Sequence, residues 1–240
     1  MAFPQIRAVL FDKDGTLLDF DKSWAPINRS TANWAAGGDP EFAERLMAVA
    51  GFDPLTERTR SGSLYAAGNT AEIAEAWRAA GVSLPLGELI AELDRRFTEN
   101  ATQAVAVPRL AETVGGLARR GFLLGIASSD SKGAIARFVA TVGLSDRFVF
   151  FAGYDSGYGY KPAPGMLTAF SDQTGVPASQ IAMVGDNLHD LEMARAAGAG
   201  LRVAVLTGTG TRAELAPHAD LCLESIADLP EALAAATANS

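Results

Sequence analysis

Two acidic residues follow an apolar run near the start of the sequence, at a spacing that could support nucleophilic and acid–base chemistry. Asp12 and Asp14 come directly after residues 6–11, and Gly15 lets the backbone turn sharply behind them. Residues two apart on an extended segment point the same way, so both carboxylates can share one site. One could act as nucleophile and metal ligand, and the other as general acid and base.

A third carboxylate, Asp186, follows a different apolar run at residues 181–184. Mg²⁺ prefers oxygen ligands in octahedral geometry and keeps several waters, so Asp12, Asp14 and Asp186 predict a magnesium site. Lys161 and the hydroxyl of Ser128 would complete a cradle for phosphoryl oxygens.

Each of these residues taken alone has an ordinary structural explanation. Asp186 and Asp190 lie four residues apart near an expected helix start, where they could simply complement the helix dipole. A serine after a strand is often a helix cap, and an Asp-x-Asp pair is often a solvated turn. What favours a functional site is that the residues all follow apolar runs.

Those runs are rich in Val, Ile, Leu and Phe, which predicts buried strands. The expected strands are residues 6–11, 122–127, 148–151, 181–184, 203–206 and 221–223. Helical stretches between them end at Gly143, Gly175 and Gly198. The alternation predicts a doubly wound α/β fold with a mostly parallel sheet, whose ligand site lies outside the carboxyl ends of the strands.

Residues 20–104 break this alternation and predict an inserted all-helical domain. The segment is rich in Ala, Glu, Leu and Arg, and Asp39-Pro40 with Gly51 brackets one of its helices. Its tryptophans, Trp24, Trp34 and Trp77, are expected to form a small core of their own. The expected core domain is therefore residues 1–19 with 105–240.

Composition excludes several classes of partner. The formal net charge of −8 argues against nucleic acid, whose binding needs clustered Lys and Arg. An anionic substrate would also be repelled at long range, so a phosphate site must be built locally. No run approaches ~18 apolar residues, so we expect no membrane span. A single cysteine, Cys222, and the lack of a visible secretion signal favour the cytoplasm.

The combined pattern resembles the haloacid dehalogenase superfamily. The run FDKDGTLL at residues 11–18 is similar to its first motif, DxDGT, and Ser128 stands at the second motif. Lys161, in KPAP, stands at the third, and GDNLHD at residues 185–190 resembles the fourth. The insert is similar to the helical cap class of that superfamily, in which phosphoglycolate phosphatases and β-phosphoglucomutase share this layout.

The resemblance implies a role for each matching position. Asp12 would be the nucleophile and a Mg²⁺ ligand, and Asp186 another ligand. Asp14 would bind the metal through its backbone carbonyl and use its carboxyl as acid and base. Ser128 and Lys161 would hold the transferring phosphoryl group. Further residues expected at the phosphate or around the metal are Gly15, Thr16, Ser129, Asn187 and Asp190, the last through water or as an outer partner.

Lys13 departs from the apolar residue usual at the middle of the first motif. We expect its side chain to point away from the site, since it lies between Asp12 and Asp14. His189 and His218 have no expected role in the chemistry.

The sequence therefore predicts a Mg²⁺-dependent phosphatase that hydrolyses a small phosphorylated metabolite through an aspartyl-phosphate, with 2-phosphoglycolate as the leading substrate. Two alternatives stay open: a phosphosugar mutase of the β-phosphoglucomutase type, and a phospho-accepting receiver or binding module. Whether the chain is a monomer or a homodimer also stays open. The insert cations that could contact a substrate carboxylate are Lys22, Arg29, Arg58 and Arg60.

Overall fold

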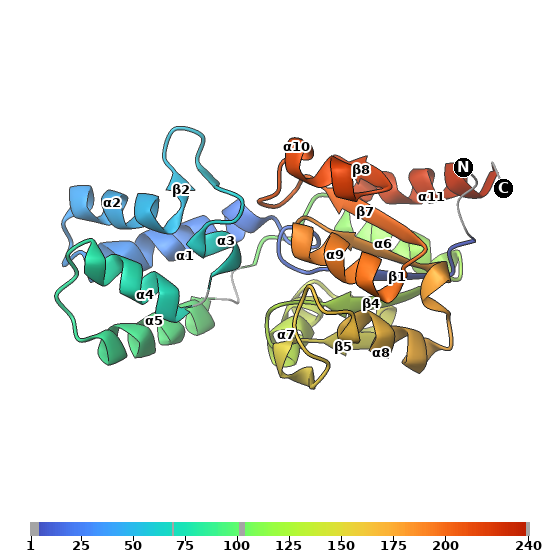
Figure 1. The fold of residues 1–240 in the computed structure, drawn as a ribbon, viewed down its shortest axis with the longest axis horizontal. Coiled ribbons are helices and arrows are strands. Elements are labelled where there is room, and N and C mark those ends of the chain that lie inside the picture. The colour runs from blue at the N-terminus through green and yellow to red at the C-terminus, as the bar shows by residue number, and fades with distance from the viewer. Residues whose placement is uncertain (1–4, 69, 101–103, 239–240) are drawn as a thin grey trace. The chain divides into compact units, whose positions relative to one another are not determined.

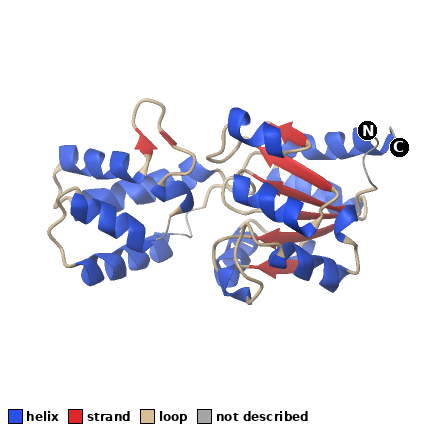
Figure 2. Cartoon of the chain, viewed as in Figure 1, coloured by secondary structure: helices blue, strands red, loops and turns tan. Residues whose placement is uncertain are grey.

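The computed structural model of the chain describes residues 5–68, 70–100 and 104–238. The chain forms two compact units, one of Met1–Asp19 with Ala106–Ser240 and one of Phe20–Val105. We call them the core unit and the insert. Figure 2 shows strands and helices interleaved in the core unit, whereas the insert is mainly helical.

A six-stranded sheet organises the core unit, in the order β5-β4-β1-β6-β7-β8. Each neighbouring pair of strands is parallel. The predicted doubly wound α/β fold is therefore confirmed. The strands are β1 (Ala8–Phe11), β4 (Leu123–Ala127), β5 (Phe150–Ala152), β6 (Ile181–Gly185), β7 (Leu201–Val205) and β8 (Leu221–Leu223).

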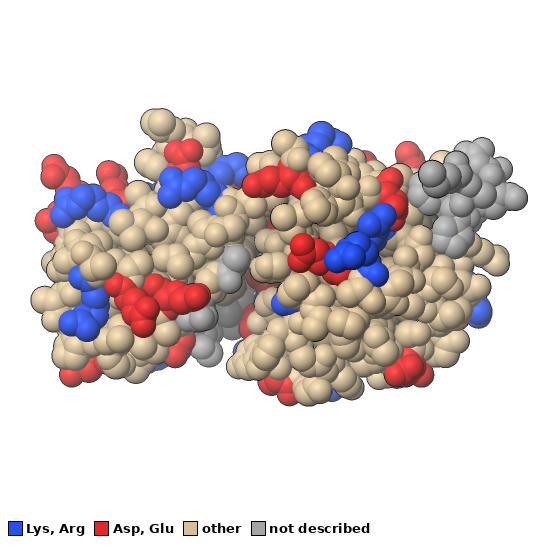
Figure 3. All heavy atoms as spheres, in the orientation of Figure 1, with Lys and Arg blue, Asp and Glu red and all other residues tan. Residues whose placement is uncertain are grey.

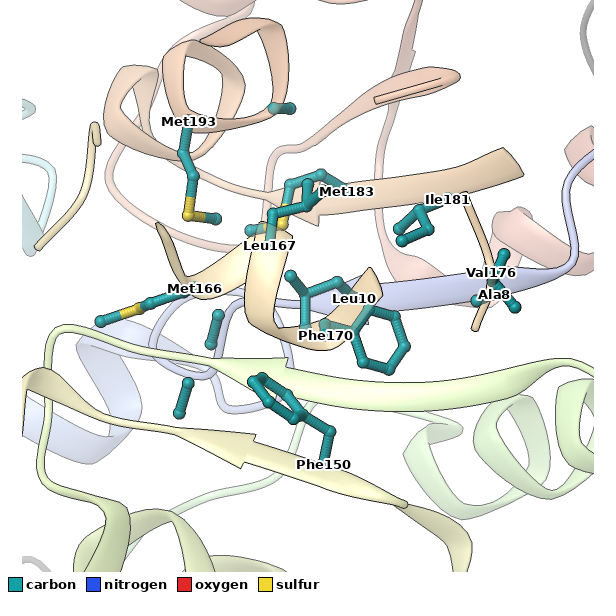
Figure 4. Packing of buried hydrophobic residues seen from close by; sticks show 13 residues of the cluster. Ala8, Leu10, Phe150, Met166, Leu167, Phe170, Val176, Ile181, Met183 and Met193 are labelled. Carbon is teal, nitrogen blue, oxygen red and sulfur yellow. The ribbon is translucent and has the colours of Figure 1, made fainter. Parts of the chain in front are cut away.

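Helices cover both faces of this sheet (Figure 1). They are α6 (Leu110–Arg119), α7 (Lys132–Thr141), α8 (Gly165–Thr174), α9 (Leu188–Ala197), α10 (Arg212–Leu215) and α11 (Leu229–Ala238). Figure 4 shows how α8 and α9 pack on one face, where Phe170 of α8 lies beside Leu10 of β1 and Phe150 of β5. The rings of Phe150 and Phe170 are 5.4 Å apart between centroids. This apolar layer holds the helices on the sheet through burial of aromatic and aliphatic surface.

The register of the sheet brings the ends of its central strands together. Phe11, the last residue of β1, pairs with Ile126 of β4 and with Val184 of β6. The residues that follow these three strands therefore emerge side by side at the carboxyl edge, which is where parallel α/β sheets bind ligands.

The insert contains five helices within its described residues: α1 (Phe20–Ala35), α2 (Pro40–Ala50), α3 (Leu64–Ala67), α4 (Thr70–Ala79) and α5 (Leu86–Asn100). Asp39 caps α2 by accepting from the N–H of Phe42, and Gly51 ends it with a φ of 113°. Trp77 is fully buried in the insert's own apolar cluster, and its indole N–H donates to Leu46 O at 2.9 Å.

The insert also contains a short hairpin that the all-helical prediction did not include. Strands β2 (Phe52–Asp53) and β3 (Arg58–Thr59) pair antiparallel over two residues each. The N–H of Thr59 donates to Asp21 of α1 at 2.8 Å, so a helix side chain holds the hairpin in place.

Charges are mixed on the molecular surface. On the face drawn in Figure 3, Lys and Arg atoms lie among Asp and Glu atoms in both units. Within the described residues, no helix combines the length and the apolar character needed to span a membrane.

Candidate active site

Three buried carboxylates meet at the carboxyl edge of the sheet. Asp12 follows β1 and donates its N–H to Val184 O at 2.8 Å, which ties it to β6. Asp186 follows β6, and Asp190 lies in the first turn of α9. Each offers an oxygen within 4.8 Å of the other two. The residues are 6%, 4% and 2% exposed, so water does little to screen their mutual repulsion.

Lys161 supplies positive charge to this cluster. Its Nζ lies 2.5 Å from Asp12 Oδ1 and 2.5 Å from Asp190 Oδ1, and its side chain is 3% exposed. A buried ammonium is stable only when charged or polar partners replace its water. Asp190 therefore fixes the lysine beside Asp12 by a direct ion pair. Its expected role as an outer or water-mediated partner of the metal stays a prediction.

The charges of the cluster shift its protonation equilibria. Burial raises the pKa of Asp12 from 3.8 to about 7, an effect that Lys161 opposes and that Asp190 and Asp14 reinforce. Burial also raises the pKa of Asp186 well above its ordinary value, with further contributions from Asp12 and Asp190. Burial alone would lower the pKa of Lys161, but the carboxylates of Asp12 and Asp190 raise it. The site therefore holds more negative charge than one lysine balances, which is the condition for binding a cation.

A loop after β7 contacts the carboxylate of Asp186 through a hydrogen bond and close packing. The N–H of Thr209 donates to Asp186 Oδ2 at 2.9 Å, and the hydroxyl of Thr207 donates to Gly15 O at 2.6 Å. A Cβ on Gly208 would lie 1.8 Å from Asp186 Oδ2, so only glycine fits between them. Gly15 itself has a φ of +79°, which favours glycine at the turn behind Asp14.

The residues of this loop were missed in the sequence analysis, although a signal for them was present. They follow the apolar run at residues 203–206, as the predicted site residues follow theirs. Applying the strand-end rule to every run would have included them.

The expectation that Lys13 points away from the site is wrong. Its Nζ lies 2.9 Å from Asp14 Oδ2 and 2.7 Å from Asp130 Oδ2. The strand ends at Phe11, and the carbonyl of Lys13 accepts from the N–H groups of Leu17 and Leu18 in a turn. Alternation of side chains holds only on extended backbone, so it does not predict the direction of a residue in this turn.

Burial alone would lower the pKa of Lys13, but the neighbouring carboxylates of Asp14 and Asp130 raise it. The lysine is 4% exposed, so it is a buried cation held by two carboxylates. The Asp14 side chain, 22% exposed, keeps partial access to solvent.

The other predicted phosphate-binding residues differ in their surroundings. Ser128 is 1% exposed at the end of β4, and its Oγ accepts from the N–H of Asp130 at 3.1 Å. Ser129 is exposed. Thr16 is fully buried, and its hydroxyl has no hydrogen-bond partner within the described part of the chain. Ser128 is therefore the serine that lies at the buried edge of the sheet.

Asn187 has a structural role in the site. Its side chain accepts from the N–H of His189 at 3.2 Å and caps α9, while Asp190 Oδ2 accepts from the N–H of Asn187 at 3.2 Å. This reciprocal cap sets the direction in which Asp190 faces Lys161. His189 and His218 are both exposed.

The four insert cations named from the sequence have different environments. Lys22 and Arg29 line a pocket of about 860 Å³ between α1, α2 and the hairpin, and the Arg29 guanidinium lies 5.5 Å from the centroid of Phe52. Arg58 lies 3.3 Å from Asp21, and Arg60 donates to Ala48 O at 2.8 Å. Lys22 and Arg29 are therefore the cations of this set that border an open pocket.

Chemically, the core-unit site combines a carboxylate oxygen with a cation at its side. Asp12 can attack an electrophile, and Lys161 can bind an anion that arrives there. The buried carboxylates of Asp186 and Asp190 cannot receive an anion themselves, because like charges repel strongly where water is excluded.

Known proteins resemble this chain over most of its length. A family model described as haloacid dehalogenase-like hydrolase matches residues 6–198. A phosphoglycolate phosphatase from Shigella boydii is 26% identical over 215 residues, which cover 82% of this chain and 80% of that protein. The corresponding enzyme of Escherichia coli K12 is 25% identical over the same shares of the two chains.

Solved structures share the fold. A predicted phosphoglycolate phosphatase from Haemophilus somnus superposes with a TM-score of 0.75 at 19% identity, over 95% of this chain and 98% of that one. A candidate β-phosphoglucomutase from Thermotoga maritima gives a TM-score of 0.72 at 17% identity, over 96% and 99%. The predicted class of enzyme, a phosphoric monoester hydrolase, is confirmed by the family and the curated relatives. Because the family model matches most of this chain, the chain belongs to the haloacid dehalogenase-like hydrolases.

Proposed function

We propose that this enzyme hydrolyses a phosphate monoester of a small metabolite by transferring the phosphoryl group to Asp12. The observation that carries the proposal is the ion-paired arrangement of Asp12, Lys161 and Asp190 at the carboxyl edge of the sheet. A carboxylate nucleophile beside a fixed ammonium suits attack on an anionic electrophile, because the ammonium offsets the repulsion between the two negative groups.

Mg²⁺ is the proposed cofactor, and the residues present fit it. The cluster offers hard oxygen donors from three buried aspartates, and Asp186 is held in an environment that disfavours its charge unless a cation is present. Asp12, Asp186 and the backbone carbonyl of Asp14 would hold the ion. When bound, it supplies positive charge that stabilises the phosphoryl oxygens.

The reaction then follows from the chain's own groups. A carboxylate oxygen of Asp12 forms a bond to phosphorus as the ester P–O bond breaks, and the carboxyl of Asp14 gives its proton to the departing oxygen. Asp14 next takes a proton from water, which attacks the same phosphorus. The bond between phosphorus and Asp12 breaks, and inorganic phosphate leaves. Lys161 and the Ser128 hydroxyl stabilise the phosphoryl oxygens in both steps.

The proposed substrate class is a small phosphorylated metabolite, and 2-phosphoglycolate is the first to test because curated relatives are phosphoglycolate phosphatases. The insert is proposed as the cap that selects among substrates.

A mutase would use the same core residues. A structural neighbour is described as a candidate β-phosphoglucomutase, so the experiments below also test this alternative. The family match favours an enzyme over a receiver module.

We propose the cytoplasm as the compartment of this enzyme, since the single Cys222 forms no disulfide within the chain.

Trapping the phosphoenzyme tests the proposal. Borohydride reduces an acyl phosphate to an alcohol, so protein quenched during turnover with Mg²⁺ should carry homoserine at position 12, detected by peptide mass spectrometry. Asp12→Asn should give no such peptide. Asp172→Asn, a change at an exposed aspartate of α8, should give the wild-type result. Turnover without any modification at position 12 would contradict an Asp12 intermediate.

The amount of inorganic phosphate that the untrapped enzyme releases distinguishes a hydrolase from a mutase. A hydrolase releases one inorganic phosphate per substrate consumed, whereas a mutase returns the phosphoryl group to a sugar and releases little. Measuring phosphate release from 2-phosphoglycolate and from a hexose 1-phosphate decides between them.

A further inference from the structure

Lys13 connects the two loops that carry the proposed chemistry. Its Nζ lies 2.9 Å from Asp14 Oδ2, in the turn after β1, and 2.7 Å from Asp130 Oδ2, in the loop after β4. The Lys13 side chain is 5% exposed, so solvent competes little for either contact. A lysine buried between two carboxylates restricts both of them, because moving either one leaves a buried charge less well paired.

Asp130 is a fixed anchor for this contact. Its Oδ1 accepts from the N–H of Ser131 at 2.7 Å, its own N–H donates to Ser128 Oγ at 3.1 Å, and its carbonyl accepts from the N–H of Tyr154 at 3.0 Å. The loop that carries Ser128 is thus held by two hydrogen bonds within it and by a third to Tyr154. Because Lys13 contacts both Asp14 and Asp130, it fixes the Asp14 carboxylate relative to the Ser128 hydroxyl that Asp130 contacts.

We propose that Lys13 is a positioning residue that fixes the carboxylate of Asp14 relative to Ser128 by bridging Asp14 and Asp130. The inference rests on the proposed function, in which Asp14 handles the proton and Ser128 holds the phosphoryl group. Lys13 acts through Asp14, so its contribution belongs to the steps in which Asp14 gives or takes a proton. Misplacing a catalytic group by about 1 Å can cost ~10²-fold in rate.

The expected signature depends on the leaving group. Lys13→Met keeps an unbranched side chain of similar length and removes its charge, so Asp14 loses its ion pair with Lys13. Hydrolysis of an alkyl phosphate should fall by ~10–10²-fold in kcat, with KM changed little. The single-turnover release of nitrophenol from p-nitrophenyl phosphate should fall much less, because that leaving group departs without a proton. Lys13→Arg keeps a cation and should recover part of the loss.

A double-mutant cycle with Asp14→Asn separates positioning from a general structural effect. If Lys13 acts through Asp14, then Lys13→Met should add little further loss in alkyl phosphate hydrolysis once Asp14 is already Asn. A lysine needed only for stability would add its full effect in both backgrounds. The control is Lys132→Met, at an exposed lysine two residues beyond Asp130. This change should leave the turnover of both substrates unaltered.

Asp130→Asn provides a second route if Lys13→Met fails to fold, because it weakens the same bridge from the other end. It should show the same preference for loss with the alkyl substrate. Equal losses in the single-turnover step for alkyl and aryl substrates in both variants, or additive losses in the cycle, would overturn the inference. A wild-type enzyme that turned over neither substrate would instead contradict the proposed function, so the two failures are distinguishable.

Discussion

Asp12 and Asp14 lie two residues apart but meet different neighbours. Asp12 is buried and contacts Lys161, whereas the side chain of Asp14 is 22% exposed and contacts Lys13. A nucleophile benefits from a fixed position inside the site, and a group that exchanges protons with water benefits from access to it. The environments therefore match the separate tasks proposed for the two carboxylates.

Substituting each carboxylate should separate these tasks. Asp12→Asn should abolish turnover of every substrate, because no other group is proposed to bond to phosphorus. Asp14→Asn should reduce hydrolysis of an alkyl phosphate by ~10²–10⁴-fold, the usual contribution of general acid catalysis. With p-nitrophenyl phosphate, stopped-flow measurements on Asp14→Asn should show a burst of nitrophenol and then slow turnover. Equal losses in the single-turnover step for both substrates would show that Asp14 is not the acid.

The sequence sufficed to predict some of these positions and not others, for a physical reason. Asp12 and Asp186 follow buried strands of a parallel sheet, and the sheet itself brings such positions together. Lys13 lies in a turn, where the direction of a side chain depends on which carboxylate it meets. Its partner Asp130 is 117 residues away in the chain, so spacing could not reveal the contact.

The same distinction holds for whole elements. The strands of the core unit were predictable because buried parallel strands are continuous apolar runs, whereas β2 and β3 have two residues each and no such pattern. A hydrogen bond joins the hairpin to Asp21 of α1, and local sequence does not encode such a tertiary contact. The Asp39 cap and Gly51 end of α2 were predictable because the signals lie within the helix's own ends.

The loop after β7 makes a prediction that depends on close packing. A methyl group at position 208 would lie 1.8 Å from Asp186 Oδ2, so Gly208→Ala must displace either the loop or the carboxylate. We expect the variant to need ~10-fold or more Mg²⁺ for half-maximal activity, since partners that orient a metal ligand contribute 10–100-fold in affinity. Titration of activity with Mg²⁺ measures this.

Gly116→Ala is the matched control for that substitution. Gly116 lies inside α6, where an added Cβ would lie 3.9 Å from Nη2 of Arg119, an ordinary van der Waals distance. The change should leave the Mg²⁺ requirement unaltered and raise helix stability slightly. An unaltered Mg²⁺ requirement in Gly208→Ala would mean that the loop does not position Asp186.

For the molecule as a whole, the insert is expected to set substrate choice, because the core-unit groups are proposed to bind only the phosphoryl end that all monoesters share. Lys22 and Arg29 border the insert pocket, whereas Arg60 donates to Ala48 O. Lys22→Ala or Arg29→Ala should lower the ratio of 2-phosphoglycolate to aryl phosphate turnover by ~10-fold, the value of one charge-assisted hydrogen bond. Arg60→Ala should change it little. An unchanged ratio in both pocket variants would remove these two cations as carboxylate contacts.

The core-unit carboxylates should also link the stability of the protein to pH and, through the proposed Mg²⁺, to metal. In the unfolded chain Asp12 loses its proton near its ordinary pKa of 3.8, whereas in the folded protein it keeps the proton up to about pH 7. Between these values the folded state binds more protons than the unfolded state. The free energy of unfolding contributed by Asp12 must therefore fall as pH rises through this window.

Asp12→Asn should consequently stabilise the metal-free protein, even though it abolishes activity. The substitution removes one negative charge from the buried cluster with Asp186 and Asp190, and an amide has no proton to lose. In EDTA at pH 8 we expect the variant to be more stable than the wild type by ~1 kcal/mol or more, which corresponds to about 2–4 °C in Tm for a chain of this size. At pH 5 the difference should shrink, because wild-type Asp12 is then largely protonated. Saturating Mg²⁺ at pH 8 should raise the Tm of the wild type more than that of the variant, since the ion binds only the folded site. Calorimetry at both pH values, with Asp172→Asn as the control, tests this; a variant less stable than the wild type in EDTA at pH 8 would show that Asp12 is not destabilised by its charge.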